Sequence, residues 1–274
     1  MGCTMAGQKG LDTTQTISRT VRCILVDLSG TVHVDDELTK DALPTLKALR
    51  ESDCHIRFVT NTTKESKRQL RDRLYRLGFK IHEYEIYSSL VAAVNLIKKE
   101  NLRPLLLVDN QAMEDFKDVC DFEGHPNAVV IGLAPDKFNR HSLNVAFRLI
   151  IEGAKLIAIH EGRFYRSRTG LSLGPGPFVK MLEYATNKPA TIVGKPSTEF
   201  FKHALGDIPP SQAVMIGDDV RDDIKGAQDL GIRGFLVKTG KYRPGDEHLI
   251  ENPPYSVVEN FAEAVEKVLK SSRI

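Results

Sequence analysis

Long apolar runs are missing from this sequence of 274 residues. The longest apolar stretches are short pieces such as LLLV and AVVIGLA, whereas a helix that spans a bilayer needs about 20 apolar residues. The first ten residues, MGCTMAGQKG, also lack the apolar core of a secretory signal peptide. We therefore expect a cytoplasmic protein, with the nucleus also open, that begins with a flexible polar tail over residues 1–19.

Closely spaced cysteines are missing as well. Cys3, Cys23, Cys54 and Cys120 lie far apart in the sequence, and no CxxC pair occurs. Disulfide frameworks and zinc sites are recognised by regular, close cysteine spacings. The sequence therefore predicts reduced thiols and no metal site built on cysteine.

The third absence is a strong excess of one charge. The 38 basic residues nearly balance the 36 acidic ones, which leaves a formal net charge of +2. Surfaces that bind nucleic acid or anionic membranes are usually far more basic. We expect neither nucleic acid nor a membrane as a partner.

Strand-like and helix-like segments alternate along most of the chain, which is typical of a parallel sheet covered by helices. The length favours two domains over one. The predicted strands cover 21–27, 55–61, 105–109, 128–131 and 156–159, and three more lie in TIVGKP, AVMIGDD and GFLVKTG. The predicted helices cover 42–50, 90–99, 141–151 and 178–187, and one more begins at a capping box of Thr62 and Glu65.

The first predicted strand ends in an acid, Asp27. Five of the six residues before it are apolar, which favours a buried parallel strand. A carboxylate at the carboxyl end of such a strand points into the crevice where α/β proteins bind ligands. One acid at this place is only suggestive, and its meaning depends on partners from later strands.

Two later strands end in groups that suit a phosphate. Thr60 and Asn61 close the segment HIRFVTN, and Lys195 closes the strand of TIVGKP. A hydroxyl, an amide and an ammonium can all donate hydrogen bonds to phosphate oxygens. Each also has a simpler interpretation: Thr60 and Asn61 could cap a helix, and Lys195 could be a solvated lysine.

The segment AVMIGDDVRDDIKGAQDLGI is the most specific one. Its strand is followed by four acids within six positions: Asp218, Asp219, Asp222 and Asp223. Acids at a helix start suit the helix dipole, but four of them repel one another unless a cation is bound. Oxygen ligands without cysteine or histidine favour Mg²⁺.

These segments together predict one reaction. Asp27 would attack a phosphoryl group to form an aspartyl-phosphate, which water then hydrolyses. Mg²⁺ would offset the repulsion between the two anions, and Lys195 and Asn61 would share the charge of the transferring group.

The four segments, in this order, resemble the haloacid dehalogenase (HAD) phosphatase superfamily. DLSGT, VTN, GKP and GDDVRDD are similar to its motifs one to four. The resemblance implies a Rossmann-like parallel-sheet core. Because 134 positions separate Asn61 from Lys195, it also implies an inserted α/β cap of the C2 type, as in the NagD-like branch. We place the core at 20–100 and 189–274 and the cap at 101–188.

The resemblance also implies roles for individual residues. Asp27 matches the catalytic nucleophile, and Asp27, Ser29 and Asp218 match the metal ligands, with Asp223 supporting the metal site. The phosphate-binding positions are matched by Asp27, Leu28, Ser29, Thr60, Asn61 and Lys195. Asp219 and Asp222 match no firm position.

Ser29 departs from the superfamily pattern. Most of its phosphatases have a second Asp at this place, which acts as general acid and base. A serine hydroxyl cannot hold a proton in reserve near neutral pH, and such catalysis is typically worth about 10²–10⁴-fold in rate. We therefore expect substrates whose leaving groups need little protonation, such as phospholysine, phosphohistidine or pyrophosphate.

The cap is expected to select the small phosphorylated substrate or phosphoamino acid. Its contact segments are predicted at Gly174–Pro177 and at HEGRFYR, where His160, Arg163 and Tyr165 could touch a leaving group or could simply be surface residues. Members of this branch often pair through the cap, so a homodimer is expected.

Two other functions stay open. Without the second Asp, the protein could be a catalytically weak regulator that holds a phosphorylated ligand. It could also be a receiver-like module phosphorylated on Asp27, although such modules have about half this length.

Overall fold

The computed structural model describes residues 21–118, 123–167 and 170–271. A six-stranded parallel sheet forms the first of two units, with the strand order β14-β13-β12-β1-β4-β5. Its strands are β1 (Cys23–Asp27), β4 (His55–Thr60), β5 (Ile86–Ser88), β12 (Ala213–Gly217), β13 (Arg233–Val237) and β14 (Ser256–Val258).

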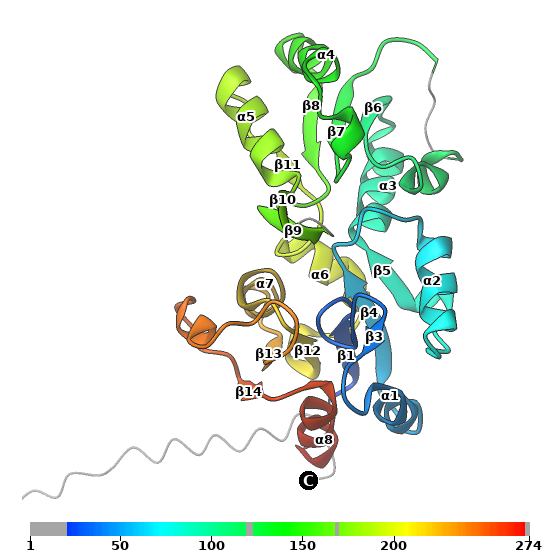
Figure 1. The fold of residues 1–274 in the computed structure, drawn as a ribbon, viewed down its shortest axis with the longest axis vertical. Coiled ribbons are helices and arrows are strands. Elements are labelled where there is room, and N and C mark those ends of the chain that lie inside the picture. The colour runs from blue at the N-terminus through cyan, green and yellow to red at the C-terminus, as the bar shows by residue number, and fades with distance from the viewer. Residues whose placement is uncertain (1–20, 119–122, 168–169, 272–274) are drawn as a thin grey trace, which may run out of the picture.

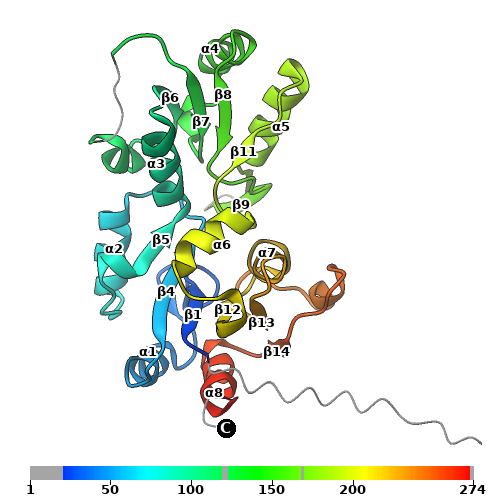
Figure 2. The same ribbon diagram turned by 180° about the vertical axis from the view of Figure 1, so that it is seen from behind.

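Helices cover both faces of this sheet. Successive side chains of the central strand point to opposite faces, so its apolar residues are buried on both sides. Ile24 and Val26 pack into one cluster, with α1 (Ala42–Arg50), α2 (Lys67–Arg76) and α8 (Phe261–Ser271). Cys23 and Leu25 pack into another, with α6 (Thr198–Leu205) and α7 (Gly226–Gln228). Figures 1 and 2 show α1 and α8 side by side at the base of this core.

The second unit has a parallel sheet of its own, with the strand order β11-β8-β7-β6. Its strands are β6 (Pro104–Leu107), β7 (Ala128–Ile131), β8 (Lys155–Ala158) and β11 (Thr191–Ile192). Helix α3 (Ser89–Glu100) covers one face, and α4 (Arg140–Ile151) and α5 (Gly176–Thr186) cover the other. The predicted α/β class, a parallel core with an inserted α/β cap, is confirmed.

Two antiparallel hairpins lie near the junction of the units. One joins β2 (His33–Val34) to β3 (Glu37–Leu38) in the core. The other joins β9 (Phe164–Ser167) to β10 (Gly170–Leu173) and lies between cap and core in Figure 1. Short helical turns complete the described chain: η1 (Glu83–Glu85), η2 (Ala112–Phe116), η3 (Pro135–Lys137), η4 (Pro210–Gln212), the π-helical η5 (Val220–Lys225) and η6 (Asp246–His248).

Elements of the cap lie on both sides of the predicted bounds 101–188. Helix α3 packs on the cap sheet although it precedes residue 101, and β11 pairs with β8 although it follows residue 188. The strand of TIVGKP therefore ends at Ile192 and belongs to the cap sheet. The prediction that this strand ends at Lys195 is wrong, because the backbone turns towards the core before it reaches the lysine.

The predicted capping box is wrong as well. Helix α2 begins at Lys67, and the Ser66 hydroxyl accepts a hydrogen bond from the Gln69 N–H at 3.2 Å. Glu65 instead forms an ion pair with Arg73 at 2.7 Å. The segment between β4 and α2 is thus a loop, which leaves its side chains free to contact the cap.

The predictions for the N-terminal tail and for the cysteines fall only partly on described residues. Cys23 and Cys54 are free thiols, as predicted, and burial raises the pKa of Cys23 to about 12. Cys3, Cys120 and the tail over 1–19 lie outside the described residues. Within the described ranges, no helix combines the length and apolarity that crossing a bilayer requires.

Candidate active site

The carboxyl ends of three neighbouring strands meet at one edge of the core sheet. Asp27 is the last residue of β1, Thr60 is the last residue of β4, and Asp218 follows the last residue of β12. Because β12, β1 and β4 are adjacent and parallel, these ends converge. The sequence placed all three at strand ends, and the topology brings them together.

Lys195 connects two acids in this site. Its Nζ lies 2.6 Å from Asp27 Oδ1, 2.6 Å from Asp223 Oδ1 and 3.2 Å from the carbonyl oxygen of Val59. Its side chain is only 3% exposed. Burial lowers the pKa of Lys195, but the charges of Asp223 and Asp27 outweigh burial and raise it above its ordinary value. The lysine is therefore a fixed positive charge.

Asn61 holds the backbone of Lys195. Its Nδ2 donates to the Lys195 carbonyl at 2.9 Å, and its Oδ1 accepts from the Lys195 N–H at 2.9 Å. The preceding Gly194 is required here, since a Cβ would lie 2.5 Å from Asn61 Oδ1. Asn61 thus fixes the lysine from a distant segment.

The other residues that match the phosphate-binding positions lie beside Asp27. Thr60 is buried, and its Oγ1 accepts from the Thr62 N–H at 3.3 Å. Leu28 is also buried, and its carbonyl accepts from Thr31 and other residues of the following turn. Ser29 is exposed and forms a backbone bridge with His33.

A loop after β13 closes the site around Asp218. The Lys241 N–H donates to Asp218 Oδ2 at 2.7 Å, and the Thr239 hydroxyl donates to the Gly30 carbonyl. Gly240 has φ +55°, and a Cβ there would lie 2.1 Å from Asp218 Oδ2 and 2.5 Å from Gly30 Cα. Only glycine fits at this place, so the loop is tightly packed against the carboxylate.

Three carboxylates of the site lie close enough to share one cation. Asp27, Asp218 and Asp223 are all buried, and one oxygen from each lies within 4.8 Å of the others. Burial and the neighbouring charge of Asp27 raise the pKa of Asp218 to about 7. Burial also raises the pKa of Asp223, against the effect of Lys195. Hard oxygen donors that repel one another fit Mg²⁺.

The two acids without a predicted role contact residues of the site, and Asp222 Oδ2 accepts from Asn61 Nδ2 at 3.5 Å. Asp219 Oδ1 accepts from the N–H groups of Arg221 and Asp222 at 3.0 Å each, so it caps η5. Its Oδ2 lies 3.1 Å from Lys241 Nζ. Burial, followed by the charge of Asp219, raises the pKa of Asp222 to about 6. The sequence did not single out Lys241. Only its position shortly after a strand and the glycine before it could have indicated its role.

The cap contributes His160 to the junction above the site. Its Nδ1 accepts from the Gly162 N–H at 3.0 Å, so Nε2 carries the proton and faces Thr63 Oγ1 at 3.4 Å. The same hydroxyl accepts from the Leu133 N–H at 3.1 Å. Burial, with the charges of Lys241 and Lys195, lowers the pKa of His160 to about 4. The imidazole is therefore neutral at physiological pH.

The other predicted cap residues differ in their contacts. Lys64 of the core places its Nζ 4.1 Å from the centre of the Tyr165 ring, a cation–π contact that links the loop before α2 to the β9–β10 hairpin. Arg163 is exposed. Gly174 and Gly176 pack against the backbone around Gly162, which shapes the start of α5.

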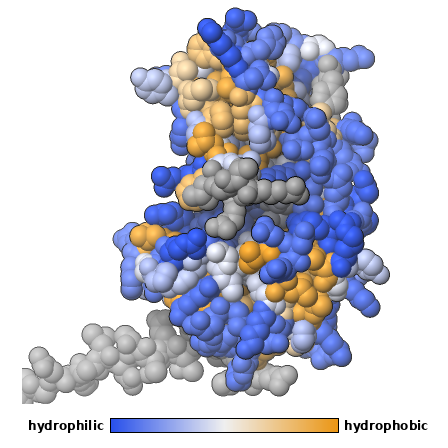
Figure 3. Space-filling view, in the orientation of Figure 1, coloured by the Kyte–Doolittle hydropathy of each residue, from blue (hydrophilic) through white to orange (hydrophobic). Residues whose placement is uncertain are grey.

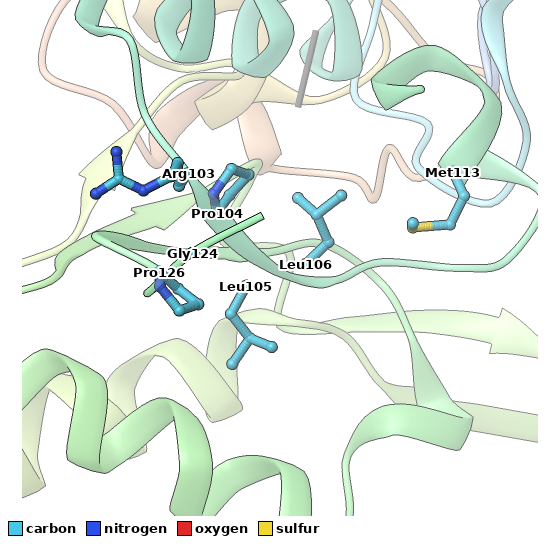
Figure 4. Close-up of a pocket in the computed structure, with 7 residues that line it drawn as sticks. All are labelled: Arg103, Pro104, Leu105, Leu106, Met113, Gly124 and Pro126. Atoms are coloured by element: carbon cyan, nitrogen blue, oxygen red, sulfur yellow. The ribbon is translucent and has the colours of Figure 1, made fainter. Parts of the chain in front are cut away.

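A separate pocket of about 260 Å³ lies at the β6 edge of the cap sheet (Figure 4). Its lining residues are Arg103, Pro104, Leu105, Leu106, Met113, Gly124 and Pro126. None of the predicted site residues lines it. The chemistry indicated by the sequence therefore belongs to the carboxylate cluster and not to this pocket.

The chain matches two family profiles. Residues 24–123 match one described as haloacid dehalogenase-like hydrolase, and residues 192–264 match one described as HAD-hydrolase-like. The part of the chain between them contains most of the cap.

Curated relatives match almost the full length. The human haloacid dehalogenase-like hydrolase domain-containing protein 2 is 54% identical over 254 residues, which cover 92% of this chain and 97% of that protein. The human phospholysine phosphohistidine inorganic pyrophosphate phosphatase is 40% identical over 258 residues, covering 91% and 95%. Among solved structures, a glycerol phosphate phosphatase of Mycobacterium tuberculosis in complex with magnesium has a TM-score of 0.79 at 26% identity, covering 92% of this chain and 78% of that one.

Proposed function

The chain belongs to the haloacid dehalogenase-like hydrolases and is a phosphatase of the NagD-like, C2-capped type, and from this premise we propose that it acts through an aspartyl-phosphate on Asp27. The observation that carries the proposal is the buried cluster of Asp27, Lys195, Asp218 and Asp223. A nucleophilic carboxylate, a fixed cation and further oxygen ligands are the groups that phosphoryl transfer requires.

In the first step a carboxylate oxygen of Asp27 forms a bond to phosphorus. The bond from phosphorus to the leaving group breaks, and the leaving group takes the electron pair. Lys195, held by Asn61 and Asp223, offsets negative charge on the transferring phosphoryl group. In the second step water attacks the same phosphorus, which releases phosphate and restores Asp27.

The donor set fits Mg²⁺. Asp27, Asp218 and the backbone carbonyl of Ser29 would hold the cation, with Asp223 in support, and the magnesium complex of the mycobacterial relative is consistent with this choice. When bound, Mg²⁺ would supply positive charge that offsets the repulsion between the carboxylate and the phosphate.

The serine at position 29 favours substrates whose leaving groups need no proton. The position has an exposed hydroxyl and no carboxyl, so it offers no acid to protonate an alkoxide leaving group. Small molecules or phosphoamino acids with P–N or P–O–P bonds need less help. The name of the relative that is 40% identical, a phospholysine phosphohistidine inorganic pyrophosphate phosphatase, supports this class.

Ser29 also favours a second candidate function, that of a regulatory protein which binds a phosphorylated ligand and turns it over very slowly. Retention of Asp27, Lys195 and Asp218 in one buried cluster supports the enzyme instead.

The test is phosphate release from pyrophosphate, phospholysine and a simple alkyl phosphate, with and without Mg²⁺. Asp27→Asn is the matched variant, because it keeps the shape and removes the nucleophile. We expect release from the first two substrates that needs Mg²⁺ and disappears in the variant. Binding without any release would support the regulatory protein, and release that persists in Asp27→Asn would refute the aspartyl-phosphate.

We also propose that two copies pair through the cap. Figure 3 shows apolar surface on the cap, and α5 with the neighbouring hairpin exposes Phe164, Leu173, Met181 and Tyr184, the last at 92%. Exposed apolar patches of this kind mark interaction sites. Light scattering should give a dimer for the wild type and a monomer for Tyr184→Glu. Tyr75→Glu, at an exposed tyrosine of the core, is the control that should stay dimeric.

A further inference from the structure

The two lysines of the site differ in how many of their ammonium N–H donors already have a partner. Lys195 is buried, and its ammonium contacts two carboxylates and a carbonyl. The Lys241 side chain is 65% exposed, and among the described residues its Nζ forms one ion pair, with Asp219 at 3.1 Å. An ammonium has three N–H donors. Lys241 can therefore bind a further anion without giving up Asp219.

Lys241 is held in place at the rim of the site. Its own N–H donates to Asp218 Oδ2, and the preceding Gly240 packs against Asp218 and Gly30 with no room for a Cβ. On the other side, Thr239 donates to the Gly30 carbonyl. The backbone of Lys241 thus has a fixed distance from the carboxylates, unlike that of a lysine on an open loop.

Lys241 lies at the rim of the carboxylate cluster, where its N–H donates to Asp218 and its ammonium pairs with Asp219. Burial, with the charges of Lys241 and Lys195, lowers the pKa of His160, which lies two residues beyond the end of cap strand β8. Its ring stays neutral and donates from Nε2 towards Thr63. In an in-line displacement the leaving group lies across the phosphorus from Asp27, and Lys241 supplies an exposed positive charge at the rim of the site.

We propose that Lys241 is a specificity-determining residue that binds a second anionic group on the leaving side of the scissile phosphate. The preferred substrates are therefore phosphoanhydrides such as pyrophosphate, in preference to phosphoamines, whose leaving nitrogen group carries no negative charge. This inference rests on the proposed function, since it takes Asp27 as the nucleophile.

Pyrophosphate is also a substrate that does not need the acid which is absent at Ser29. When Asp27 bonds to one phosphorus of pyrophosphate, the P–O bond to the bridging oxygen breaks, and the second phosphate leaves with the electron pair. A leaving phosphate needs no proton, but it gains negative charge, which the Lys241 ammonium stabilises. Water then releases the first phosphate, so one pyrophosphate and one water give two phosphates.

The first experiment compares kcat/KM for pyrophosphate, phospholysine and p-nitrophenyl phosphate in wild type and Lys241→Met, with Mg²⁺ and the full chain. We expect a loss of about 10- to 100-fold for pyrophosphate, the range of a charge-assisted hydrogen bond, and a change below about threefold for the other two. Lys238→Met is the matched control, because Lys238 is three positions away and pairs with Glu259 outside the site. An equal loss on all three substrates, or no loss on any, would overturn the proposal.

The second experiment measures binding and does not depend on turnover. Calorimetry with methylenediphosphonate and with inorganic phosphate should show that Lys241→Met weakens the diphosphonate at least about tenfold and leaves phosphate unchanged. If the diphosphonate binds wild type no better than phosphate does, the second anion site does not exist. Failure of the proposed function would instead appear as wild-type turnover no higher than that of Asp27→Asn, whatever the binding result.

Discussion

Replacing Asn61 by alanine is the sharpest test of how this site is built. The sequence predicts Asn61 as a phosphate binder, but in the structure both ends of its amide hold the backbone of Lys195. If that is its role, Asn61→Ala acts through the lysine and not on the phosphate. The two possibilities give different results in stability, in affinity and in rate.

The magnitude follows from the contacts. The two hydrogen bonds are 2.9 Å long and partly buried, so their loss should lower the free energy of unfolding by about 1–3 kcal/mol. Lys195 then loses its fixed backbone position. A misplacement of about 1 Å in a catalytic group commonly costs about 10²-fold in rate. Asn61→Asp should be worse, because a carboxylate oxygen would face the Lys195 carbonyl in place of the amide donor.

The assay combines urea unfolding with kcat and with inhibition by inorganic phosphate. A double-mutant cycle with Lys195→Met measures the coupling between the two residues. If Asn61 works through the lysine, Asn61→Ala should lower kcat little further in the Lys195→Met background. Asn144→Ala, at an exposed asparagine of α4, is the control. The reasoning is refuted if Asn61→Ala leaves stability unchanged and weakens phosphate inhibition more than about tenfold, since that pattern belongs to a direct phosphate contact.

Three further predictions concern the rim and the junction of the two units. Gly240→Ala should abolish most phosphatase activity, because its Cβ would strike the Asp218 carboxylate, whereas Gly245→Ala, with a positive φ but open space, should keep it; phosphate release measures both. Thr63→Val should lower the free energy of unfolding in urea by about 1–3 kcal/mol, because it leaves the buried Leu133 N–H without its partner, and Thr63→Ser should restore the loss. The His160 pKa is about 4 in the folded protein against 6.5 as its ordinary value, so the unfolded chain binds more protons between these values and stability falls as pH drops from about 6.5 to 4. His160→Asn should flatten that dependence by at most about 3 kcal/mol, and a slope unchanged from wild type would contradict the assignment.

The sequence predicts those parts of the site that depend on strand ends. A buried apolar run is easy to recognise, and the residue that closes it must lie at the edge of the sheet, so the pattern of residues alone places Asp27 and Asp218 in one crevice. The strands 23–27, 128–131 and 213–217 follow from the same signal.

The rest depends on contacts that the local sequence pattern does not show. Glu65 has the spacing of a capping box, but it pairs with Arg73 of α2, and Ser66 caps that helix instead. Asn61 carries the side chain of a phosphate binder, and only the approach of the Gly194–Lys195 turn makes it a backbone clamp. Lys241 has no motif of its own, since its importance comes from packing of the loop at Gly240.

The strand order of the core has a consequence for synthesis on the ribosome. Strand β1 is central in the finished sheet, between β4 and β12, yet β12 begins at residue 213, after the whole cap. At about 5–20 residues per second, the open edge of β1 waits roughly ten seconds or more for its neighbour. The cap sheet, by contrast, is built from strands between 104 and 192 and can close while that edge is still unpaired. A nascent chain stalled after β11 should therefore contain a folded cap beside an unfinished core, and this is the species that chaperones would meet.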